Sequence, residues 1–349
     1  MSIMTETNPS GMTIGIDLAK NVFAVHGVDE NGKAVLVKPK VARDQLLPLI
    51  VNMPPCLIGM EACTGAHHWA RAFRQYGHTV RLMAPKLVTP YRMSGKRGKN
   101  DAADAAAICE AVTRPSMRFV PIKEEHQQNI LCIHRTRQGF VAERTATYNR
   151  VRGLIAEFGI VLPQKVAPLR QGIYLHLEEL PGWVNRCVGD LLAHADHLEK
   201  QIAEYDKAIA AIAREDERSR RLMQRPGIGP TTASALLASL GIGHEFKNGR
   251  QVAAWIGLTP GQYSSGGKAR LGSITKAGDS YLRSLLVLGA RAVLNGLGDK
   301  QDRFSRWARA LLERRGYWKA AVAIAAKNAR LAWAILKYGE DFRMKESAT

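Results

Sequence analysis

Short apolar runs rich in β-branched residues alternate with helical patterns along the first third of the chain. The runs at 12–17, 22–28 and 34–38 predict three successive strands, which favours an antiparallel meander. A helix at 43–51, a buried strand at 56–61, a helix at 64–76, a strand at 78–83 and a helix at 101–112 follow. This order predicts a mixed α/β domain and differs from that of a doubly wound sheet.

The pattern becomes helical after Pro121. Residues 124–159 place apolar side chains on one stripe and many basic side chains off it, and a Pro- and Gly-containing linker is expected over 161–184. Apolar residues then step alternately by four and three, which predicts a coiled coil over 185–218: Leu191, Ala195, Leu198, Ile202, Tyr205, Ile209 and Ile212. Such a seam fits dimerisation, and the alternative is a helix packed on its own domain.

The last third, 219–345, predicts a mostly helical domain. It opens with Arg-Pro-Gly-Ile-Gly-Pro at 225–230, a sequence similar to a helix-hairpin-helix loop, and a helical run follows. A Gly/Ser-rich loop is expected at 262–268, and basic helices continue to the end of the domain. The chain therefore divides into an α/β part and a helical part, in keeping with about two domains for 349 residues.

Charge is the composition's most informative feature. Lys and Arg number 50 against 31 Asp and Glu, which gives a net charge of +19 and a pI near 10.0. Cations that neutralise phosphates release counterions, so this excess favours a nucleic-acid partner. Colloidal solubility is the alternative, although a negative charge would serve that purpose equally well.

Other compartments and classes are disfavoured. No apolar stretch is long enough to span a membrane, and residues 1–11 lack the features of a signal peptide and are expected to form a disordered leader. Five cysteines without a Cys-x-x-Cys pair argue against a disulfide framework or a cysteine zinc site, and they fit a reducing cytoplasm.

Four carboxylates occupy positions that suggest metal chemistry. Asp17 and Glu61 end apolar strands, while Asp101 and Asp104 lie three residues apart on one helix face. Acids gathered in this way need cations to neutralise them, and Mg²⁺ prefers carboxylate oxygens. In a basic protein this arrangement favours metal-dependent phosphodiester chemistry. The alternative is that two are turn acids and two are helix-start acids stabilised by the helix dipole.

Three acidic motifs, GIDLAKNVF, GMEACTG and GKNDAADAAAI, resemble those of a RuvC-like domain with the RNase H fold. More specifically, they resemble the DEDD transposases of the insertion sequence one-ten family, which includes pilin-gene DNA invertases. The segments PGIGPTTASALLASLG and AAWIGLTPGQYSSGGKARLGSITKAGDSYLRSLL are similar to that family's C-terminal domain. The resemblance extends from about residue 12 to 342, with the RuvC-like domain expected at 12–160.

The resemblance implies roles for these residues. Asp17, Glu61, Asp101 and Asp104 would bind Mg²⁺, for which Mn²⁺ could substitute, and Ser265 would be a serine nucleophile, with Ser264 as the lesser candidate. Ser265 has no neighbouring histidine or acid, so its activation is expected from the metal cluster in a composite site where the two domains meet. The resemblance implies that these domains come from different subunits. Taken by themselves, the Gly-rich surroundings of Ser265 also fit a flexible surface loop.

The resemblance also implies partners. These are donor and target DNA, a structured noncoding guide RNA that carries sequence choice, and a homo-oligomer, either a dimer or a tetramer, in the bacterial cytoplasm at the nucleoid. The residues expected to contact nucleic acid flank the candidate chemistry or form the helix-hairpin-helix-like loop: Arg92, Lys96, Arg97, Lys99, Gly227, Gly229, Lys268, Arg270 and Lys276.

Three other functions are weighed against this one. A Mg²⁺-dependent nuclease or Holliday-junction resolvase would use the acids alone, and Ser265→Ala would leave cleavage intact. A non-catalytic nucleic-acid scaffold would tolerate Asp17→Asn. An actin-like ATPase shares the Gly-Ile-Asp strand but needs a second Gly-rich phosphate loop, which the sequence lacks at a comparable position.

Overall fold

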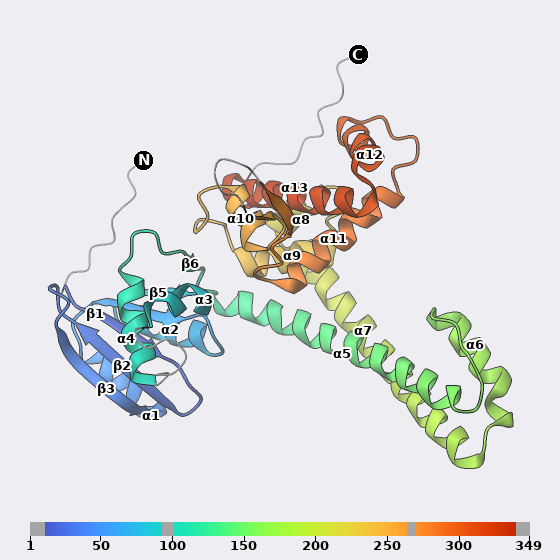
Figure 1. Ribbon diagram of the computed structural model, residues 1–349, viewed down its shortest axis with the longest axis horizontal. Helices are drawn as coiled ribbons and strands as arrows, with labels where there is room; N and C mark the ends of the chain where they lie inside the picture. Colours follow the sequence, from blue (N-terminus) through green and yellow to red (C-terminus); the bar gives the residue numbers. More distant parts are fainter. Residues whose placement is uncertain (1–10, 93–100, 264–269, 340–349) are drawn as a thin grey trace. The chain divides into compact units, whose positions relative to one another are not determined.

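The computed structural model describes residues 11–92, 101–263 and 270–339 (Figure 1). The chain divides into two compact units, Met1–Glu124 and Glu125–Thr349. The first unit is mixed α/β, and the second is mainly helical, as the sequence predicts. The expected leader at 1–11 lies almost entirely outside the described residues.

The first unit is built on a six-stranded mixed sheet with the order β3-β2-β1-β4-β5-β6. The strands β1, β2 and β3 form the predicted antiparallel meander, while β4 and β5 continue the sheet parallel to β1. A short antiparallel edge strand, β6, completes it. The strands are β1 Thr13–Asp17, β2 Val22–Val28, β3 Ala34–Ala42, β4 Leu57–Glu61, β5 Thr79–Met83 and β6 Phe119–Val120.

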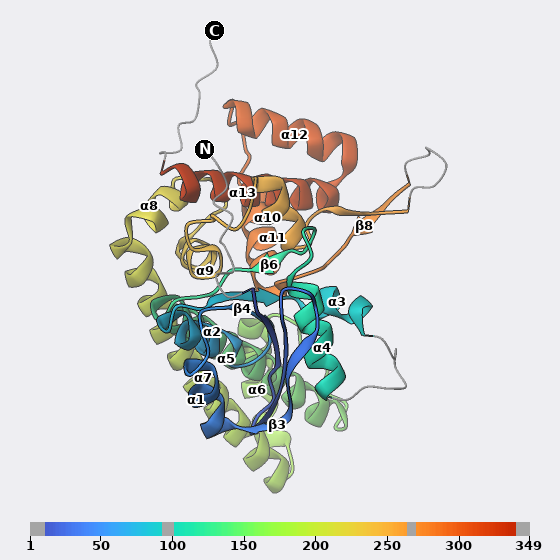
Figure 2. The ribbon, with the colours of Figure 1, turned by 90° about the vertical axis from the view of Figure 1, so that its left-hand side faces the viewer.

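Helices cover both faces of this sheet (Figure 2). One face packs against α1 (Arg43–Val51) and α2 (Ala66–Gln75), whose Trp69 and Phe73 enter the core. The other face packs against α4 (Asp101–Val112), while α3 (Pro85–Val88) and the 3-10 turn η1 (Thr89–Tyr91) precede that helix in the chain.

Two strand glycines allow α4 to lie directly on the sheet. A Cβ on Gly15 of β1 would stand 2.2 Å from the Ala105 carbonyl oxygen, and one on Gly59 of β4 would stand 2.8 Å from the Val112 Cβ. Any larger residue would push the helix away, because helix backbone and interior side chains cannot yield by such distances. The glycines therefore fix α4, and with it Asp101 and Asp104, over β1 and β4.

The second unit contains two long helices, α5 (Glu125–Ala156) and α7 (Gly182–Glu215), which lie side by side (Figure 1). Polar contacts join them along their length. The Arg137 guanidinium donates two hydrogen bonds to Asp206, at 2.5 and 3.1 Å, and the Tyr148 hydroxyl donates to Glu199 at 2.9 Å. Because α5 packs on α7 and α9, the first compact unit ends at Glu124, whereas the domain predicted from the sequence extends to residue 160.

The heptad seam of α7 is buried within the single chain. Ala195, Leu198, Ile202 and Ile209 are each 6% exposed or less. Because α7 packs extensively against α5, the burial of these four residues is explained by packing within the same chain, which is the alternative interpretation of the heptad pattern. The seam alone therefore gives no reason to invoke a second chain.

The expected linker at 161–184 is instead structured. It contains α6 (Val166–His176), whose Leu169 and Ile173 are buried in a cluster with residues of α5 and α7. The Pro and Gly residues in this segment suggested a linker, but Pro168 lies in the first turn of α6, where its missing N–H breaks no helical hydrogen bond. The spacing of buried apolar residues such as Leu169 and Ile173 therefore makes this segment helical.

The rest of the second unit is a helical domain with one hairpin. The strands β7 and β8 pair antiparallel on either side of residues 264–269, a pairing that the sequence analysis missed. No described helix has both the length and the apolar character that a bilayer span requires. The elements are α8 Glu217–Met223, α9 Pro230–Leu240, α10 Gly249–Trp255, β7 Pro260–Gln262, β8 Leu271–Ile274, α11 Ser280–Asn295, α12 Arg303–Arg315 and α13 Tyr317–Tyr338.

Candidate active site

The four predicted carboxylates meet at one edge of the sheet in the first unit. Asp17 is the last residue of β1 and Glu61 the last of β4, and these neighbouring parallel strands end at the same edge. Asp101 and Asp104 lie in the first turn of α4, which packs on both strands. The structure thus places the four acids at the same edge of the sheet, while the function assigned to them stays a prediction.

Electrostatic repulsion within this group is visible at Asp17. The pKa of Asp17 is raised from 3.8 to about 6, first by burial and then by the charges of Asp104, Glu61 and Asp101 in that order of importance, whereas Arg92 acts to lower it. A carboxyl group with such a pKa is held where its negative charge is disfavoured. Perturbed acids of this kind are concentrated at functional sites.

The guanidinium of Arg92 lies among these acids. Its Nε is 2.7 Å from Asp104 Oδ1, and its Nη2 donates to Glu61 Oε1 at 3.5 Å. The short contact to Asp104 lacks hydrogen-bond geometry, so this buried carboxylate oxygen has no hydrogen-bond partner. Arg92 was expected to contact nucleic acid, and in this structure its positive charge faces the acidic cluster.

The acidic cluster, defined as Asp17, Glu61, Asp101 and Asp104, suits a divalent cation by its chemistry. Hard cations bind carboxylate oxygens, and the raised pKa of Asp17 indicates that its negative charge is disfavoured without a further cation. Among residues 11–92, 101–263 and 270–339, no three His, Cys, Asp or Glu side chains already converge as the ligands of one ion. The donors therefore fit the ion, and side-chain adjustment would have to complete the site.

The predicted nucleophile belongs to the segment that joins β7 and β8. Tyr263 N donates to the Arg270 carbonyl oxygen at 2.8 Å and closes the described part of this hairpin. Ser264, Ser265 and Lys268 fall within 264–269 and lie outside the described residues. The same holds for three of the basic residues before α4: Lys96, Arg97 and Lys99.

Lys276, another predicted nucleic-acid contact, has an unusual backbone. Its φ of 52° is the sole positive value at a non-glycine residue in the described part of the chain. Two glycines hold it there: a Cβ on Gly257 would stand 2.3 Å from the Ala277 oxygen, and one on Gly278 would stand 1.9 Å from the Trp255 oxygen. Strain maintained by such tight surroundings is common at functional positions.

A residue that the sequence analysis missed supports this turn. Arg283 donates from Nη1 to the Ile256 oxygen at 2.8 Å and to the Ala277 oxygen at 3.1 Å. It thereby ties together the two backbone segments that flank Lys276. Arg283 belongs to the quoted segment that ends in SYLRSLL, but that segment does not reveal its role, because the role depends on two carbonyl groups that only the fold brings together.

The helix-hairpin-helix-like loop connects α8 to α9. Gly227 has a φ of 85°, and a Cβ on it would stand only 2.8 Å from the carbonyl oxygen of Gly289 in α11. Gly227 therefore has a packing reason to be glycine, besides the predicted contact with a phosphate. Gly229 directly precedes α9, and a Cβ there would meet no atom within 4 Å.

Known proteins match both parts of the chain. Residues 14–160 match the family model of IS110-type DEDD transposases, described as "Transposase". Residues 219–306 match the model described as "Transposase IS116/IS110/IS902 family". The first match extends beyond Glu124 into α5, so the matched segment and the compact unit end at different places.

Individual relatives cover nearly the whole chain. A probable family 20 transposase of Pseudomonas aeruginosa is 47% identical over 335 residues, which cover 95% of this chain and 98% of the relative. The transposase for insertion sequence element IS1328 of Yersinia enterocolitica is 39% identical, with 96% and 99% covered. A pilin gene-inverting protein of Moraxella lacunata is a distant relative at 23% identity, with 94% and 97% covered.

These matches agree with the motifs quoted from the sequence and with the convergence of their acids on one sheet edge. Both halves are matched in the expected order, and identity well above 30% extends over almost the full length. The chain belongs to the IS110 family of DEDD transposases.

Proposed function

We propose that the protein cuts and rejoins DNA with Ser265 as the nucleophile and the acidic cluster as a Mg²⁺ site, within a RuvC-like domain. The acidic cluster is the observation that carries this proposal. Four carboxylates gathered on one sheet edge, with the pKa of Asp17 raised to about 6, have a clear use only where cations and phosphates meet.

Asp17, Glu61, Asp101 and Asp104 would hold the cation. A bound Mg²⁺ would withdraw charge from the scissile phosphate and favour ionisation of an attacking hydroxyl. Glu61 and Asp104 would exchange their contacts with Arg92 for this ion. Arg92 could then turn its guanidinium toward the nucleic acid, the partner that the sequence predicts for it.

Ser265 Oγ would attack the phosphorus of a backbone phosphodiester. A bond from phosphorus to the serine oxygen forms while the bond to one deoxyribose oxygen breaks, and that oxygen leaves as a hydroxyl after taking up a proton. Attack by a hydroxyl of the exchanged strand reverses the step and releases the serine. Because the phosphoserine link conserves the bond energy, rejoining needs no ATP.

Cations close to Ser265 in the sequence support this role. Lys268 and Arg270 would stabilise the charge that develops on the phosphoryl oxygens. The hairpin strands β7 and β8 carry the segment with Ser265, and the strained turn at Lys276 follows β8 directly. We further propose that the serine and the acidic cluster act on one phosphodiester, in a composite site formed by different subunits.

The proposed partners are donor and target DNA together with a structured guide RNA. A net charge of +19 supports binding to polyanions of either kind. Base pairing by the RNA would select the sequence, while the protein would contact backbone and shape. Two duplexes must be held together during exchange, which favours a dimer or a tetramer.

A denaturing gel tests this function. Labelled element-end DNA is incubated with Mg²⁺, the protein and RNA transcribed from the element's flank, and wild type is compared with Ser265→Ala, Ser264→Ala and Asp101→Asn. Ser273→Ala in β8 is the matched control, because Ser273 is an exposed serine of the same hairpin.

A protease-sensitive protein–DNA adduct that Ser265→Ala and Asp101→Asn both abolish, and that the control retains, is the expected result. Loss of the adduct in Ser264→Ala alone would move the nucleophile by one residue. Cleavage without any adduct, abolished in Asp101→Asn but intact in both serine variants, would identify a hydrolytic nuclease or resolvase and refute the covalent mechanism.

A further inference from the structure

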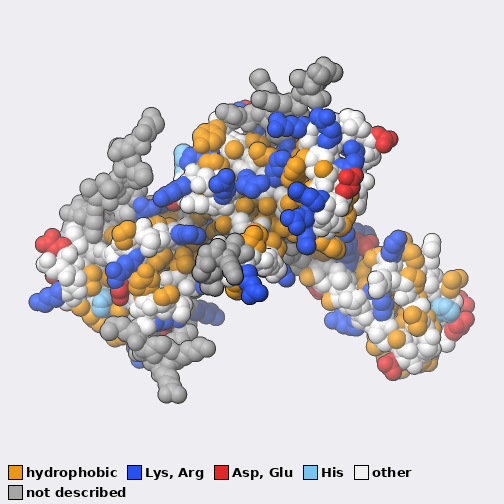
Figure 3. Space-filling model, turned by 45° about the horizontal axis from the view of Figure 1, so that its top comes forward, with side chains coloured by type: hydrophobic (Ala, Val, Ile, Leu, Met, Phe, Trp, Pro, Cys, Tyr) orange, Lys and Arg blue, Asp and Glu red, His pale blue; other side chains and the backbone are white. Residues whose placement is uncertain are grey.

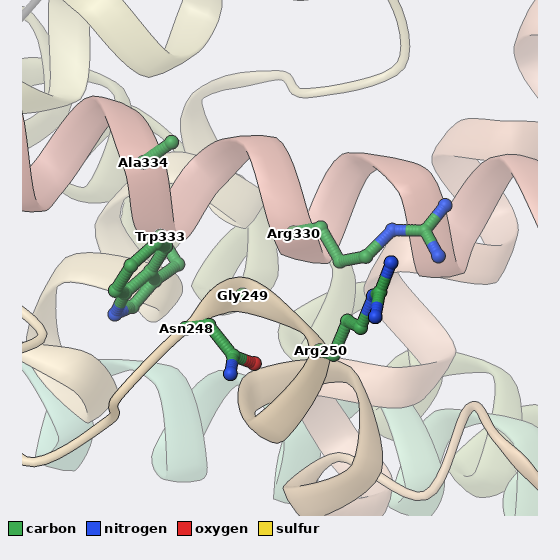
Figure 4. A pocket seen from close by; sticks show the side chains of 6 residues that line it. All are labelled: Asn248, Gly249, Arg250, Arg330, Trp333 and Ala334. Atoms are coloured by element: carbon green, nitrogen blue, oxygen red, sulfur yellow. The ribbon is translucent and has the colours of Figure 1, made fainter.

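A shallow pocket in the second unit brings two arginines together, far along the chain from the predicted site residues of the first unit. Its lining comes from the start of α10 and the middle of α13: Asn248, Gly249, Arg250, Arg330, Trp333 and Ala334. Figure 4 shows the guanidinium groups of Arg250 and Arg330 pointing toward one another from the two helices.

Backbone packing fixes this pair. A Cβ on Gly249 would stand 2.7 Å from the Arg330 carbonyl oxygen and 2.9 Å from its Cα. Only glycine allows so close an approach, so α10 begins directly against the α13 backbone at Arg330. Because Arg250 is the next residue, its side chain leaves the backbone beside Arg330.

The two helices that carry these arginines supply no compensating acid. Helices α10 and α13 contain no Asp or Glu, while α13 alone carries Lys319, Lys327, Arg330 and Lys337. Among the described residues, neither Arg250 nor Arg330 forms an ion pair. The pKa of Lys327 is lowered by burial and by the charges of Arg225, Arg330 and Arg303, which shows how positive this region is.

Like charges at such close quarters repel unless an anion joins them. Two guanidinium groups offer planar, directed donors that match phosphate oxygens. The pocket measures about 270 Å³, which is smaller than most pockets that enclose a drug-sized ligand but adequate for a phosphate group on a surface. Figure 3 shows Lys and Arg side chains gathered over the part of the second unit formed by α8–α13.

We propose that Arg250 and Arg330 together bind one backbone phosphodiester of a DNA duplex. The Trp333 ring and the exposed Asn248 border the same pocket, where the phosphate oxygens and the adjoining deoxyribose would lie. This inference rests on the proposed function only in taking DNA as the ligand. It assigns a contact that neither the acidic motifs nor the serine segment provides.

The salt dependence of DNA binding tests the inference. The affinity of the full-length protein for a fluorescent random-sequence duplex is measured by anisotropy from about 50 to 200 mM salt, for wild type, Arg250→Gln, Arg330→Gln and the double variant. Arg186→Gln is the matched control, because it removes the same charge from an exposed arginine paired with Asp190 on α7. Thermal melting checks that every variant is folded.

Loss of one shared phosphate contact lowers the magnitude of the log–log salt slope by about 0.9. We expect each single variant to show most of that change in slope and to bind DNA about tenfold more weakly. The double variant should change the slope little beyond either single variant, and the control should match wild type. Additive changes that reach about 1.8 in the double variant would indicate two separate phosphates and overturn the shared site.

Other outcomes also decide the question. An unchanged slope in the double variant would overturn the inference while leaving the transposase function intact, since wild type still binds DNA. Loss of binding to an RNA hairpin with DNA binding preserved would overturn the choice of DNA. A wild-type protein that binds no DNA would refute this inference and the proposed function together.

Discussion

Asp17→Asn is expected to abolish DNA cleavage and, without divalent cations, to make the first unit more stable at neutral pH. The carboxylate would be needed as a metal ligand, yet in the metal-free protein it lies partly buried among three other acids. Removing its charge removes both the ligand and the repulsion. A purely structural acid would behave differently, because its loss would destabilise the fold.

The magnitude follows from the pKa of Asp17, which rises from 3.8 to about 6. A tenfold change in acidity corresponds to about 1.4 kcal/mol, so ionising Asp17 in the folded protein costs about 3 kcal/mol more than in the unfolded chain. Asp17 is only half-buried, and solvent screening reduces this value. We therefore expect a gain of about 2 kcal/mol in the free energy of unfolding.

The pH dependence has a definite sign. Below about pH 4 the carboxyl is protonated in both states, so wild type and variant should be equally stable. Between about pH 4 and 6 the folded state retains a proton that the unfolded chain has released, and wild-type stability falls as the pH rises. The advantage of the variant should open across this window and stay constant above it.

Hydrogen exchange of the β1 and β4 amides reports this stability within the first unit. It is measured in chelator at about pH 7.5 and again in excess Mg²⁺, with exposed Asp44→Asn on α1 as the charge-matched control. Mg²⁺ should protect wild type more than Asp17→Asn. Faster exchange in the variant than in wild type in chelator would refute the electrostatic reasoning.

The remaining predictions concern packing, strain and burial in the second unit. Gly289→Ala should lower the free energy of unfolding, measured by urea titration, by more than about 2 kcal/mol, because its Cβ would clash with the Gly227 oxygen. Gly139→Ala in α5 is the control: its Cβ would meet open space, so it should raise the free energy of unfolding by up to about 1 kcal/mol. Lys276→Gly should raise the free energy of unfolding by about 1 kcal/mol, because glycine adopts the positive φ without strain, and Lys276→Ala should not raise it. Both variants should bind DNA more weakly when binding is measured by anisotropy. Burial lowers the pKa of His134 to about 4. Between about pH 4 and 6.5 the unfolded chain therefore binds a proton at this residue that the folded protein does not, so the free energy of unfolding should rise with pH over this range. His134→Gln should flatten this rise when denaturation is measured at several pH values.

The sequence predicts those elements in which local pattern and tertiary packing agree. The helices at 43–51 and 101–112 have the predicted bounds, since amphipathic or apolar runs there also meet the sheet. α6 was missed because Pro and Gly outweighed its apolar spacing in the interpretation. The β7–β8 hairpin was missed because its strands are only three and four residues long.

The site was predictable to a similar degree. Motifs and strand order are sufficient to bring the four acids together, because parallel strand ends share an edge. The sequence places Arg92 beside the acids as a nucleic-acid contact, but its contacts with Glu61 and Asp104 were not predictable, since they join residues 31 and 12 positions away along the chain. The pairing of Arg250 with Arg330 likewise depends on a glycine contact between helices that are distant in sequence.

The acidic cluster and the Lys276 turn both cost folding stability that neutral side chains in the cluster, or a glycine in the turn, would not cost. Among the described residues, the Arg92 guanidinium contacts two of the four carboxylates, Glu61 and Asp104, and Lys276 keeps a conformation that glycine would adopt without strain. Packing fixes both, through Gly15 and Gly59 under α4 and through Gly257 and Gly278 around Lys276. Such unfavourable arrangements persist where the surrounding fold holds them and a ligand relieves them. A divalent cation would supply the charge that the acids lack, and a phosphate would engage the lysine that the turn holds in place, so both features point to one chemistry on nucleic acid.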